Sequence, residues 1–519
     1  MRRWLMVIGM IASSIGILGS CGSLPTRTAD TLPLAEKTYK DSKLNKIFGT
    51  VTRGQAEKSG FILLRKGDQA LQERLYLADI AEHTLDAQYY IWNSDKSGKL
   101  LAQRLIRAGD RGVSVRIILD DFSIGDRNEH MLAVDSHPNI QIRIYNPFVN
   151  RSAAGKWLNF AFDFERLNRR MHNKTYTVDG VASIVGGRNI GDEYFDQNEH
   201  LNFKDLDLFT VGPVVKEVSK SFEEYWNSPW AIPIGQLVTT DPGQGDKSHL
   251  ERLLDENRIE LSQISLPVKA ESPERHFNQA VNELVWAPAA FIYDHPGGED
   301  REAFSEGPKR VAGHLLQLAQ SSANEILTES AYFVLDEPAL ELAGRLRDKG
   351  VRIRALTNSM ASNDVLPNHA SYAMVREKML TRGIELYELR PDAPSCLQTI
   401  GQSAYCDEDS FLGLHAKAAV FDRQTIYVGS CNLNLRSAYL NTEVGMFVDS
   451  AILAETLTRQ IELDMQLENS WQPKLKDNQV IWVTEIDGEE KTSTHEPQTS
   501  FFERVKEGIL TLVPGAQYY

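Results

Sequence analysis

Two stretches of the chain, "MHNKTYTVDG" and "LHAKAAVFDR", each carry a histidine and a lysine two positions apart. Both stretches have the apolar pattern of a β-strand, in which residues i and i+2 share a face. His172 and Lys174 therefore point the same way, and so do His415 and Lys417. A buried strand face rarely carries a lysine, so these two faces are candidates for an active site rather than for a core.

The two stretches correspond over a longer segment. Each histidine is followed by Lys, Asp, Gly and Asn at the same offsets, and each matched pair lies 243 residues apart, as from 172 to 415. A single H-x-K-x4-D pattern is a weak signal, but two copies with the same downstream Gly and Asn are a strong one. The matched pairs are His172 and His415, Lys174 and Lys417, Asp179 and Asp422, Gly186 and Gly429, and Asn189 and Asn432.

The remaining positions of both strands have a different expected role. Asp179 and Asp422 lie at an odd offset from the histidines, where each strand turns, so we expect them to bond the backbone of that turn. The alternate residues face the opposite side of the sheet, away from the histidines, and those of the second copy are expected in the core: Asn173, Thr175 and Thr177 in the first, and Ala416, Ala418 and Val420 in the second.

Around the motifs the chain falls into two similar halves. In each half a helical pattern leads to a strand pattern, twice in succession, and a further strand follows. The segments "RAGDRGVSVRI" and "RLRDKGVRIRA" correspond, and we expect Gly112 and Gly350 to end the two helices before them. Alternating helices and short strands predict an α/β fold with one α-β-α sandwich in each half.

The expected domain boundaries follow the changes between periodic and polar sequence. They are a leader at 1–20, a polar tether at 21–55, a first repeat at 56–235, a linker at 236–275, a second repeat at 276–475 and a C-terminal appendage at 476–519.

The N-terminus is typical of an export signal, because two arginines precede an apolar run that ends in small residues. Its end, "LGSC", resembles a bacterial lipobox, which implies cleavage before Cys21 and lipidation of the Cys21 sulfur. Several acyl chains would anchor the protein stably to a membrane. Gly22 then favours the outer membrane, with the protein facing the periplasm. An ordinary signal peptide is the alternative.

Three further cysteines are present. Cys396 and Cys406 flank the loop "CLQTIGQSAYC" and could form a disulfide in an oxidising compartment, or remain two thiols. Cys431 lies in the second motif segment, where a small buried side chain is expected. None of the cysteines has the spacing of a zinc site.

The duplicated H-x-K-x4-D pattern resembles that of the phospholipase D superfamily, and the resemblance extends over roughly residues 56–475. The segments "RLNRRMHNKTYTVDG", "GGRNIGDEYF", "YDHP" and "ALTNSMASNDVLPNHASYA" resemble the C-type bacterial cardiolipin synthases in particular. This resemblance implies two phospholipase D-like halves packed about a pseudo-twofold axis, with both motifs in one active site.

The residue types suit a phosphodiester, which is anionic and resists attack. Lys174 and Lys417 would supply positive charge, and Asn189 and Asn432 would donate hydrogen bonds to the phosphoryl oxygens. One histidine would form a phosphohistidine, and the other would act as general acid and then as general base. The resemblance implies that His172 is the nucleophile and His415 the acid/base, an order that the residues alone do not give.

Each histidine also needs a partner on its other ring nitrogen. "FKDLDLFTV" offers Asp205, with Asp207 as the alternative, and "NTEVGMFV" offers Glu443, in strands where the family carries an acidic residue. These acids could instead merely flank the strands. We expect no metal or cofactor, and interpret Asp120 and Asp121 as a turn or the rim of a cleft.

Basic and aromatic residues alternate just before the first motif. Such a segment suits anionic head groups at a bilayer surface, or it is a covering helix with a solvated basic face. Its members are Arg151, Lys156, Trp157, Phe160, Phe162, Phe164, Arg166, Arg169 and Arg170.

These observations predict a phosphatidyltransferase that makes cardiolipin from phospholipids. Phosphatidylglycerol would be the acceptor and phosphatidylethanolamine a plausible donor. A hydrolytic phospholipase D that releases phosphatidic acid is the alternative. A nuclease ranks lower because the net charge of −15 disfavours broad nucleic-acid binding. A non-catalytic lipid-binding lipoprotein also ranks lower, because both motif copies are intact. The sequence indicates no protein partner.

Overall fold

The computed structural model describes residues 39–511 except 56, 126, 150–162, 239–244, 263–270, 298–306, 402–405 and 407–409. The leader, Cys21 and Gly22 lie outside the described residues. Among the residues that are described, no helix is both long enough and apolar enough to cross a bilayer.

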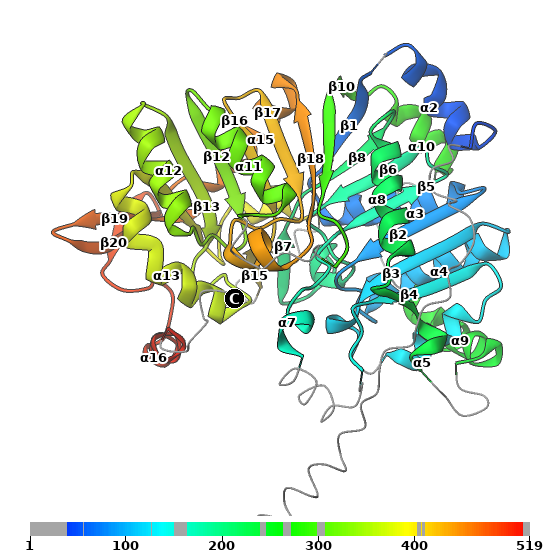
Figure 1. The fold of residues 1–519 in the computed structure, drawn as a ribbon. Helices are drawn as coiled ribbons and strands as arrows, with labels where there is room; N and C mark the ends of the chain where they lie inside the picture. Colours follow the sequence, from blue (N-terminus) through cyan, green and yellow to red (C-terminus); the bar gives the residue numbers. More distant parts are fainter. Residues whose placement is uncertain are drawn as a thin grey trace, which may run out of the picture.

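Two large mixed sheets, one from each half of the chain, lie side by side (Figure 1). In spatial order the first contains β10 (Val285–Ala287), β1 (Ser59–Leu64), β8 (Asp207–Val211), β6 (Ala182–Gly186), β5 (Thr175–Val178), β2 (Thr84–Tyr89), β3 (Ser114–Asp120), β4 (Ile140–Tyr145) and β9 (Ala231–Pro233). The second contains β11 (Ala289–Tyr293), β18 (Val444–Asp449), β17 (Thr425–Gly429), β16 (Lys417–Phe421), β12 (Glu325–Ser330), β13 (Arg352–Asn358), β14 (Ile384–Leu389), β19 (Ser470–Lys476), β20 (Gln479–Ile486) and β21 (Glu489–Ser493).

The two sheets repeat one arrangement. The order β8-β6-β5-β2-β3-β4 in the first sheet matches β18-β17-β16-β12-β13-β14 in the second. In each sheet the motif strand, β5 or β16, runs antiparallel to its sheet neighbour β2 or β12. The predicted fold of two repeated α/β halves is confirmed.

Helices cover both faces of each sheet. The outer faces carry α3 (Gly67–Ile80) and α4 (Lys96–Asp110) in the first half, and α11 (Arg310–Ser321) and α12 (Glu337–Asp348) in the second. The inner faces carry α8 (Val215–Asn227) and α15 (Ala451–Asp464). Gly112 (φ 92°) and Gly350 (φ 88°) follow α4 and α12 in the left-handed conformation that glycine adopts most easily, as expected.

One apolar core joins the two halves. It brings together the inner faces of both sheets with α8 and α15, including Leu208 and Phe222 of the first half and Val428 and Leu457 of the second. The residues of β16 that were expected to face a core, together with Ala416, belong to this cluster. Each half also has a core of its own beneath its outer helices.

A small sheet adds a direct link between the halves. In it β7 (Leu201–Lys204) pairs in parallel with β15 (Phe411–Leu414). At the end of β7 the ammonium group of Lys204 is buried between Glu329 and Asp464 of the second half. A buried cation between two acids fixes the position of one half relative to the other.

Two segments differ from the expected boundaries. Residues 43–53, expected within a tether, form α2 (Lys43–Arg53), whose Leu44 and Phe48 are buried. Much of the expected linker forms α9 (Lys247–Ser262), which packs on α4 and α5 (Asn128–Asp135), and the next helix, α10 (Pro273–Ala280), packs on α2 and α3. Both helices therefore belong to the first half. The chain leaves the first sheet after β10 and enters the second at β11, with Pro288 between the two strands.

The remaining described helices are α7 (Phe164–Leu167), α13 (Leu366–Thr381), α14 (Cys396–Thr399) and α16 (Phe501–Leu510). Helix α13 packs on β14 and β19, and α16 packs on α13. The expected C-terminal appendage thus extends the second sheet through β20 and β21 and then adds one helix.

The motif aspartates do not bond their own turns, contrary to expectation. Asp179 accepts hydrogen bonds from the backbone N–H groups of residues 82 to 84 at 2.8 to 3.3 Å, where the chain enters β2. Asp422 does the same for residues 323 to 325 at 2.7 to 2.9 Å, where the chain enters β12. Since each motif strand pairs with the strand being entered, the carboxylate faces that neighbour rather than its own turn.

Replacing Asp179 by Ala should destabilise the fold by about 1–3 kcal/mol, because three backbone donors lose their acceptor. Asp422→Ala should cost less, because Asp422 is partly exposed and water can replace its carboxylate, whereas Asp179 is fully buried. Thermal denaturation of both variants beside the wild type measures the difference. An equal or smaller loss for Asp179→Ala would contradict this account.

Candidate active site

Each motif histidine is held by a carboxylate from the other half. His172 Nδ1 lies 2.9 Å from Glu443 Oε2 and 3.0 Å from the carbonyl oxygen of Ser430. His415 Nδ1 lies 2.5 Å from Asp205 Oδ2. Both acids were expected, but Asp205 was expected with the first motif and Glu443 with the second. That assignment is wrong, because each acid reaches the histidine of the other half.

The backbone crosses in the same way. The N–H of His172 donates to the carbonyl of Thr442 at 2.9 Å, and the N–H of His415 donates to the carbonyl of Lys204 at 2.8 Å. Neither histidine can therefore be positioned by its own half, and the two motifs form one site.

The two lysines lie within this site and are buried. Lys174 Nζ donates to the carbonyl of His172 at 2.6 Å, and Lys417 Nζ donates to the carbonyl of His415. Burial lowers the pKa of Lys174 to about 7, assisted by the positive charge of Lys417 and opposed by Glu443. Burial also lowers the pKa of Lys417 to about 8, against the attraction of Asp205 and Glu443. The site is thus short of negative charge and suited to a bound anion.

The hydrogen-bond partners fix the tautomer of each histidine. Both groups facing His172 Nδ1 are acceptors, so Nδ1 carries the proton and Nε2 keeps its lone pair. His415 Nδ1 faces the acceptor Asp205 at 2.5 Å and the donor Lys417 Nζ at 3.1 Å, and the shorter contact with the carboxylate favours the proton on Nδ1. Within the described residues neither Nε2 has a hydrogen-bond partner, so both imidazoles can offer this nitrogen to a substrate.

The electrostatic surroundings of the two histidines differ. Burial lowers the pKa of His172, and Glu443 counteracts this effect. Burial and the neighbouring Lys417 lower the pKa of His415 further, to about 3. Burial alone would raise the pKa of Asp205, but its interaction with His415 lowers it, so Asp205 is an anion.

The motif asparagines lie beside this pair of histidines. Asn189 accepts a hydrogen bond from the N–H of Ile91 at 3.2 Å, and its Nδ2 is buried without a partner among the described residues. Asn432 is also buried, and its Oδ1 has no partner in the described part of the chain. The unused N–H group of Asn189 can donate to a ligand, whereas the unused oxygen of Asn432 can only accept.

The motif glycines permit a close approach of strands at this point. A Cβ atom on Gly186 would lie 2.5 Å from the carbonyl oxygen of Leu206, and one on Gly429 would lie 2.3 Å from that of Val444. Asp205 and Glu443 come just before these two contacts in the chain, so the glycines bring the strands with the orienting acids against the motif hairpins.

The other acids considered for the site have structural partners. Asp207 forms an ion pair with Arg74 at 2.9 Å and contacts neither histidine. Asp120 accepts from the N–H of Met171 at 2.9 Å, and Asp121 accepts from the N–H of Phe148 at 2.7 Å. The acidic pair therefore fixes the backbone leading into the first motif.

Part of the basic and aromatic segment lies outside the described residues, namely Arg151, Lys156, Trp157, Phe160 and Phe162. The described arginines mostly have internal partners. Arg166 pairs with Asp163 at 2.5 Å, Arg169 pairs with Glu165 at 2.8 Å, and Arg170 donates to the carbonyl of Asn146 at 2.6 Å. Phe164 is exposed.

The cysteines are placed as follows. Cys396 and Cys406 form a disulfide in the structure. Cys431 is a buried free thiol, and burial raises its pKa well above the usual value. The Cys431 thiol is therefore an unreactive, buried side chain rather than a nucleophile.

Aromatic rings around the histidines were not predicted. The ring of Tyr90 packs edge-on against His172 with centroids 5.2 Å apart. Tyr194 and Phe203 pack against His415 at 5.0 and 5.3 Å. Tyr194 lies in "GGRNIGDEYF" and Phe203 lies two residues before Asp205, so the sequence placed them near a motif without showing which histidine they contact.

Comparison with known families agrees with this geometry. The model of the PLD-like domain of cardiolipin synthase matches the chain twice, over residues 77–226 and 315–465. This chain belongs to the phospholipase D superfamily. Each matched segment contains one complete motif with its asparagine and its acid.

Relatives within the superfamily indicate which of its groups this chain is similar to. Cardiolipin synthase C of Escherichia coli (strain K12) is 37% identical over 461 residues, which cover 88% of this chain and 95% of that protein. Cardiolipin synthase 1 of Bacillus anthracis is 23% identical over 446 residues, covering 84% of this chain and 72% of that one. The chain is therefore a phospholipase D-type phosphatidyltransferase similar to the C-type cardiolipin synthases.

A solved structure shows the same fold. Phosphatidylserine synthase of Haemophilus influenzae Rd KW20 matches with a TM-score of 0.54 at 12% identity, over 89% of this chain and 96% of that one. The phospholipase D arrangement of two halves thus extends over nearly the whole described chain.

When an anion binds to this site at alkaline pH, the two lysines should take up protons. In the free protein Lys174 and Lys417 lose their protons near pH 7 and 8, so they are charged below this range and neutral above it. A bound sulfate raises both pKa values, so its affinity should fall as the pH rises through 7 to 8.

Calorimetry with sulfate at about pH 8.5, in two buffers of different ionisation enthalpy, measures the uptake. Lys174→Met should remove part of the uptake, whereas Lys378→Met, at an exposed position, should not. Heats that do not depend on the buffer would contradict the lowered lysine pKa values.

Proposed function

We propose that this protein transfers a phosphatidyl group from a donor phospholipid to phosphatidylglycerol through a phosphohistidine intermediate, forming cardiolipin. The observation that carries the proposal is the crossed pairing of His172 with Glu443 and of His415 with Asp205 around two buried lysines. It supplies two imidazoles with free Nε2 atoms and a positive cradle for one phosphodiester.

In the first step His172 Nε2 attacks phosphorus, and the bond from phosphorus to the head-group oxygen of the donor breaks. His415 gives a proton from Nε2 to that oxygen. The free protein disfavours protonated His415, whose pKa is about 3, but an arriving phosphodiester anion favours the imidazolium. Protonation of the acid is thus linked to binding of the substrate.

In the second step the glycerol hydroxyl of phosphatidylglycerol attacks phosphorus and gives its proton to His415. The bond between phosphorus and His172 Nε2 breaks, and the enzyme returns to its starting state. Lys174, Lys417 and the two asparagines hold the phosphoryl oxygens as charge shifts onto them. Phosphatidylethanolamine is the proposed donor, and water in place of the acceptor would give phosphatidic acid.

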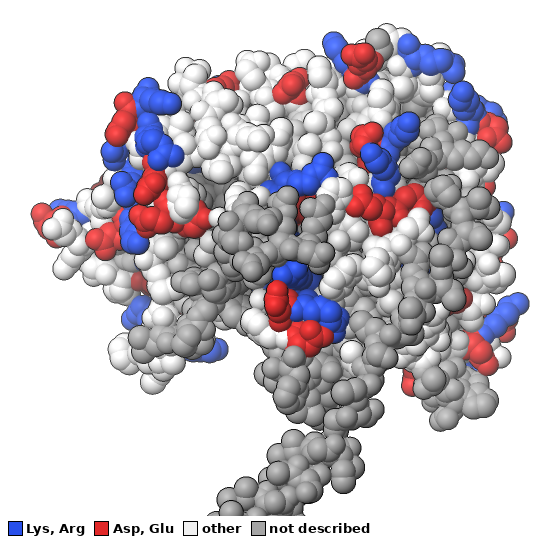
Figure 2. All heavy atoms as spheres, in the orientation of Figure 1, with Lys and Arg blue, Asp and Glu red and all other residues white. Residues whose placement is uncertain are grey.

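The charge distribution supports a lipid rather than a nucleic-acid substrate. On the face shown in Figure 2, described basic side chains are interspersed with acidic ones. The overall charge of −15 adds to this argument, since nucleic-acid affinity depends largely on phosphate neutralisation.

We further propose that lipidated Cys21 tethers the enzyme to the outer membrane, facing the periplasm. A stable anchor keeps the active site beside phospholipid head groups. The "LGSC" segment with Gly22 supports this placement.

The products formed in defined vesicles test the reaction. With phosphatidylglycerol and phosphatidylethanolamine, mass spectrometry should detect cardiolipin from the wild type and a loss of about 100-fold or more for His172→Ala and His415→Ala. Glu377→Gln, at an exposed position of α13, is a control that leaves the site and the core unchanged. Phosphatidic acid without cardiolipin would establish the hydrolytic alternative instead.

Trapping the intermediate tests the order of the histidines. A phospholipid analogue with a nitrophenol leaving group needs no general acid, so His415→Ala should accumulate an acid-labile phosphatidyl adduct. Peptide mass spectrometry should place that adduct on His172, and His172→Ala should form none. An adduct on His415 in the His172→Ala variant would reverse the assignment.

Metabolic labelling tests the anchor. Radiolabelled palmitate should be incorporated into the wild type and not into Cys21→Ala, while Cys431→Ala should be labelled normally. Separation of the membranes by density should place the wild type in the outer membrane. An unlabelled wild type would indicate an ordinary signal peptide.

A further inference from the structure

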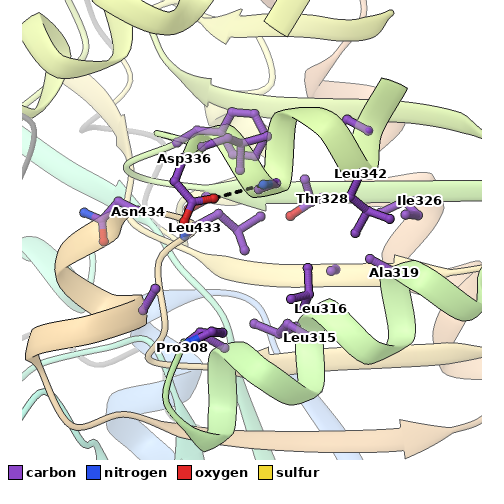
Figure 3. Close-up of a pocket in the computed structure, with 18 of the residues that line it drawn as sticks. Pro308, Leu315, Leu316, Ala319, Ile326, Thr328, Asp336, Leu342, Leu433 and Asn434 are labelled. Atoms are coloured by element: carbon purple, nitrogen blue, oxygen red, sulfur yellow. Dashed lines mark hydrogen bonds between the residues drawn. The ribbon is translucent and has the colours of Figure 1, made fainter. Parts of the chain in front are cut away.

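A deep apolar cavity opens between α11 and α12 in the second half (Figure 3). Its volume is about 500 Å³, which is within the usual range for ligand sites. The view in Figure 3 shows Leu315, Leu316 and Ala319 of α11 on one side and Leu342 of α12 on the other. Ile326 and Thr328 of β12 form part of the floor between the two helices.

Several polar groups in the wall away from Asn432 are already bonded within the protein. Asp336 accepts from the N–H of Ala339 at 3.0 Å and from the hydroxyl of Tyr439 at 2.7 Å. Thr328 donates to the carbonyl of Ala418 at 2.9 Å, and Ser330 donates to that of Tyr332 at 2.8 Å. A ligand for this part of the cavity must therefore be apolar.

The cavity begins at the active site. Asn432 lies in its wall. Ala419, another wall residue, is the next residue after Lys417 on the same face of β16. Ser330, also in the wall, pairs directly with Lys417 in the sheet register. One end of the cavity thus adjoins the groups that would hold the phosphoryl oxygens.

In the described part of the first half, four large buried side chains occupy the corresponding place. They are Arg74, Tyr89, Tyr176 and Phe195, all fully buried. Arg74 donates to the hydroxyl of Tyr89 at 3.0 Å, its guanidinium carbon lies 5.4 Å from the Phe195 ring, and Tyr176 donates to the carbonyl of Arg74 at 3.2 Å.

The second half carries a smaller residue at each matching position. The strand pairings and the motif register align these residues as Leu315, Ser330, Ala419 and Ala438, and all four line the cavity. Changes in the opposite sense also occur in the wall, from Ile184 to Tyr427, from Val178 to Phe421 and from Ala87 to Thr328, but they leave the space open. The cavity is therefore specific to the second half and is not a feature of the repeated fold.

We propose that this cavity binds one fatty acyl chain of the phospholipid whose phosphate occupies the active site. The inference rests on the proposed function for its choice of ligand. An apolar cavity with Asn432 in its wall and with Ala419 and Ser330, the neighbours of Lys417, beside it suits a molecule with a phosphodiester joined to a hydrocarbon chain. Binding of the chain would place the phosphate on the histidines and keep water out of that side of the site.

Acyl-chain length tests the proposal. Each methylene buried in the cavity should raise kcat/KM about fourfold until the cavity is full, after which the dependence should flatten. The measurement uses lipids with one head group and increasing chain length at a fixed detergent content. A flat dependence in the wild type would overturn the proposal.

A pair of matched variants separates filling of the cavity from general overpacking. Ala319 of α11 corresponds to Ala78 of α3, which is fully packed. Ala319→Leu should move the flat region to shorter chains without lowering Tm, whereas Ala78→Leu should lower Tm and leave the chain-length profile unchanged. Equal effects of the two variants on the profile would contradict a specific acyl site.

Photocrosslinking distinguishes this proposal from the proposed reaction. The probe is a phospholipid with a diazirine near the end of one acyl chain, added to the His172→Ala variant so that no turnover is needed. Crosslinks should fall on α11, α12 or β12. Crosslinks there without any phosphatidyl transfer by the wild type would support the cavity and refute the reaction. Cardiolipin formation with crosslinks only elsewhere would refute the cavity.

Discussion

The site depends on two hydrogen bonds that cross between the halves, from His172 to Glu443 and from His415 to Asp205. Each bond fixes the tautomer and direction of one imidazole, and each exists only when the two sheets are correctly packed. A buried carboxylate without its partner is costly, so the packing of the halves and the geometry of the site stabilise each other. The shared core around α8 and α15 and the burial of Lys204 in the second half supply the rigidity that such short contacts need.

Burial of several charges in one site has a chemical consequence. The lysines and histidines of the free protein all have lowered pKa values, because a dry environment disfavours their cationic forms. A phosphodiester supplies the missing negative charge. In the proposed reaction the anion that the lysines bind would also favour the protonated form of His415, so substrate binding would prepare the general acid.

Duplication has left the halves alike where the reaction needs symmetry and different where it does not. The motif residues, the glycines and the asparagines repeat, and the two aspartates clamp equivalent strands. Beneath the outer helices the halves diverge. A buried arginine and three aromatic rings fill the first half, and smaller residues leave a cavity in the second. Two motif histidines in matching positions can thus lie in halves that contact the two sides of a substrate differently.

The sequence by itself determined the repeat, the strand faces of His172 and His415, and the small set of acids that contained Glu443 and Asp205. These follow from local spacing, since a period of two fixes which residues share a strand face. Only the tertiary structure decided the crossed pairing, the target of Asp179, the helices within the expected linker and the cavity beside Lys417. Each of these depends on contacts between segments 90 or more residues apart or on the fit of helices against a sheet, such as Asp179 with His83 or His172 with Glu443. Spacing along the chain carries no information about such contacts.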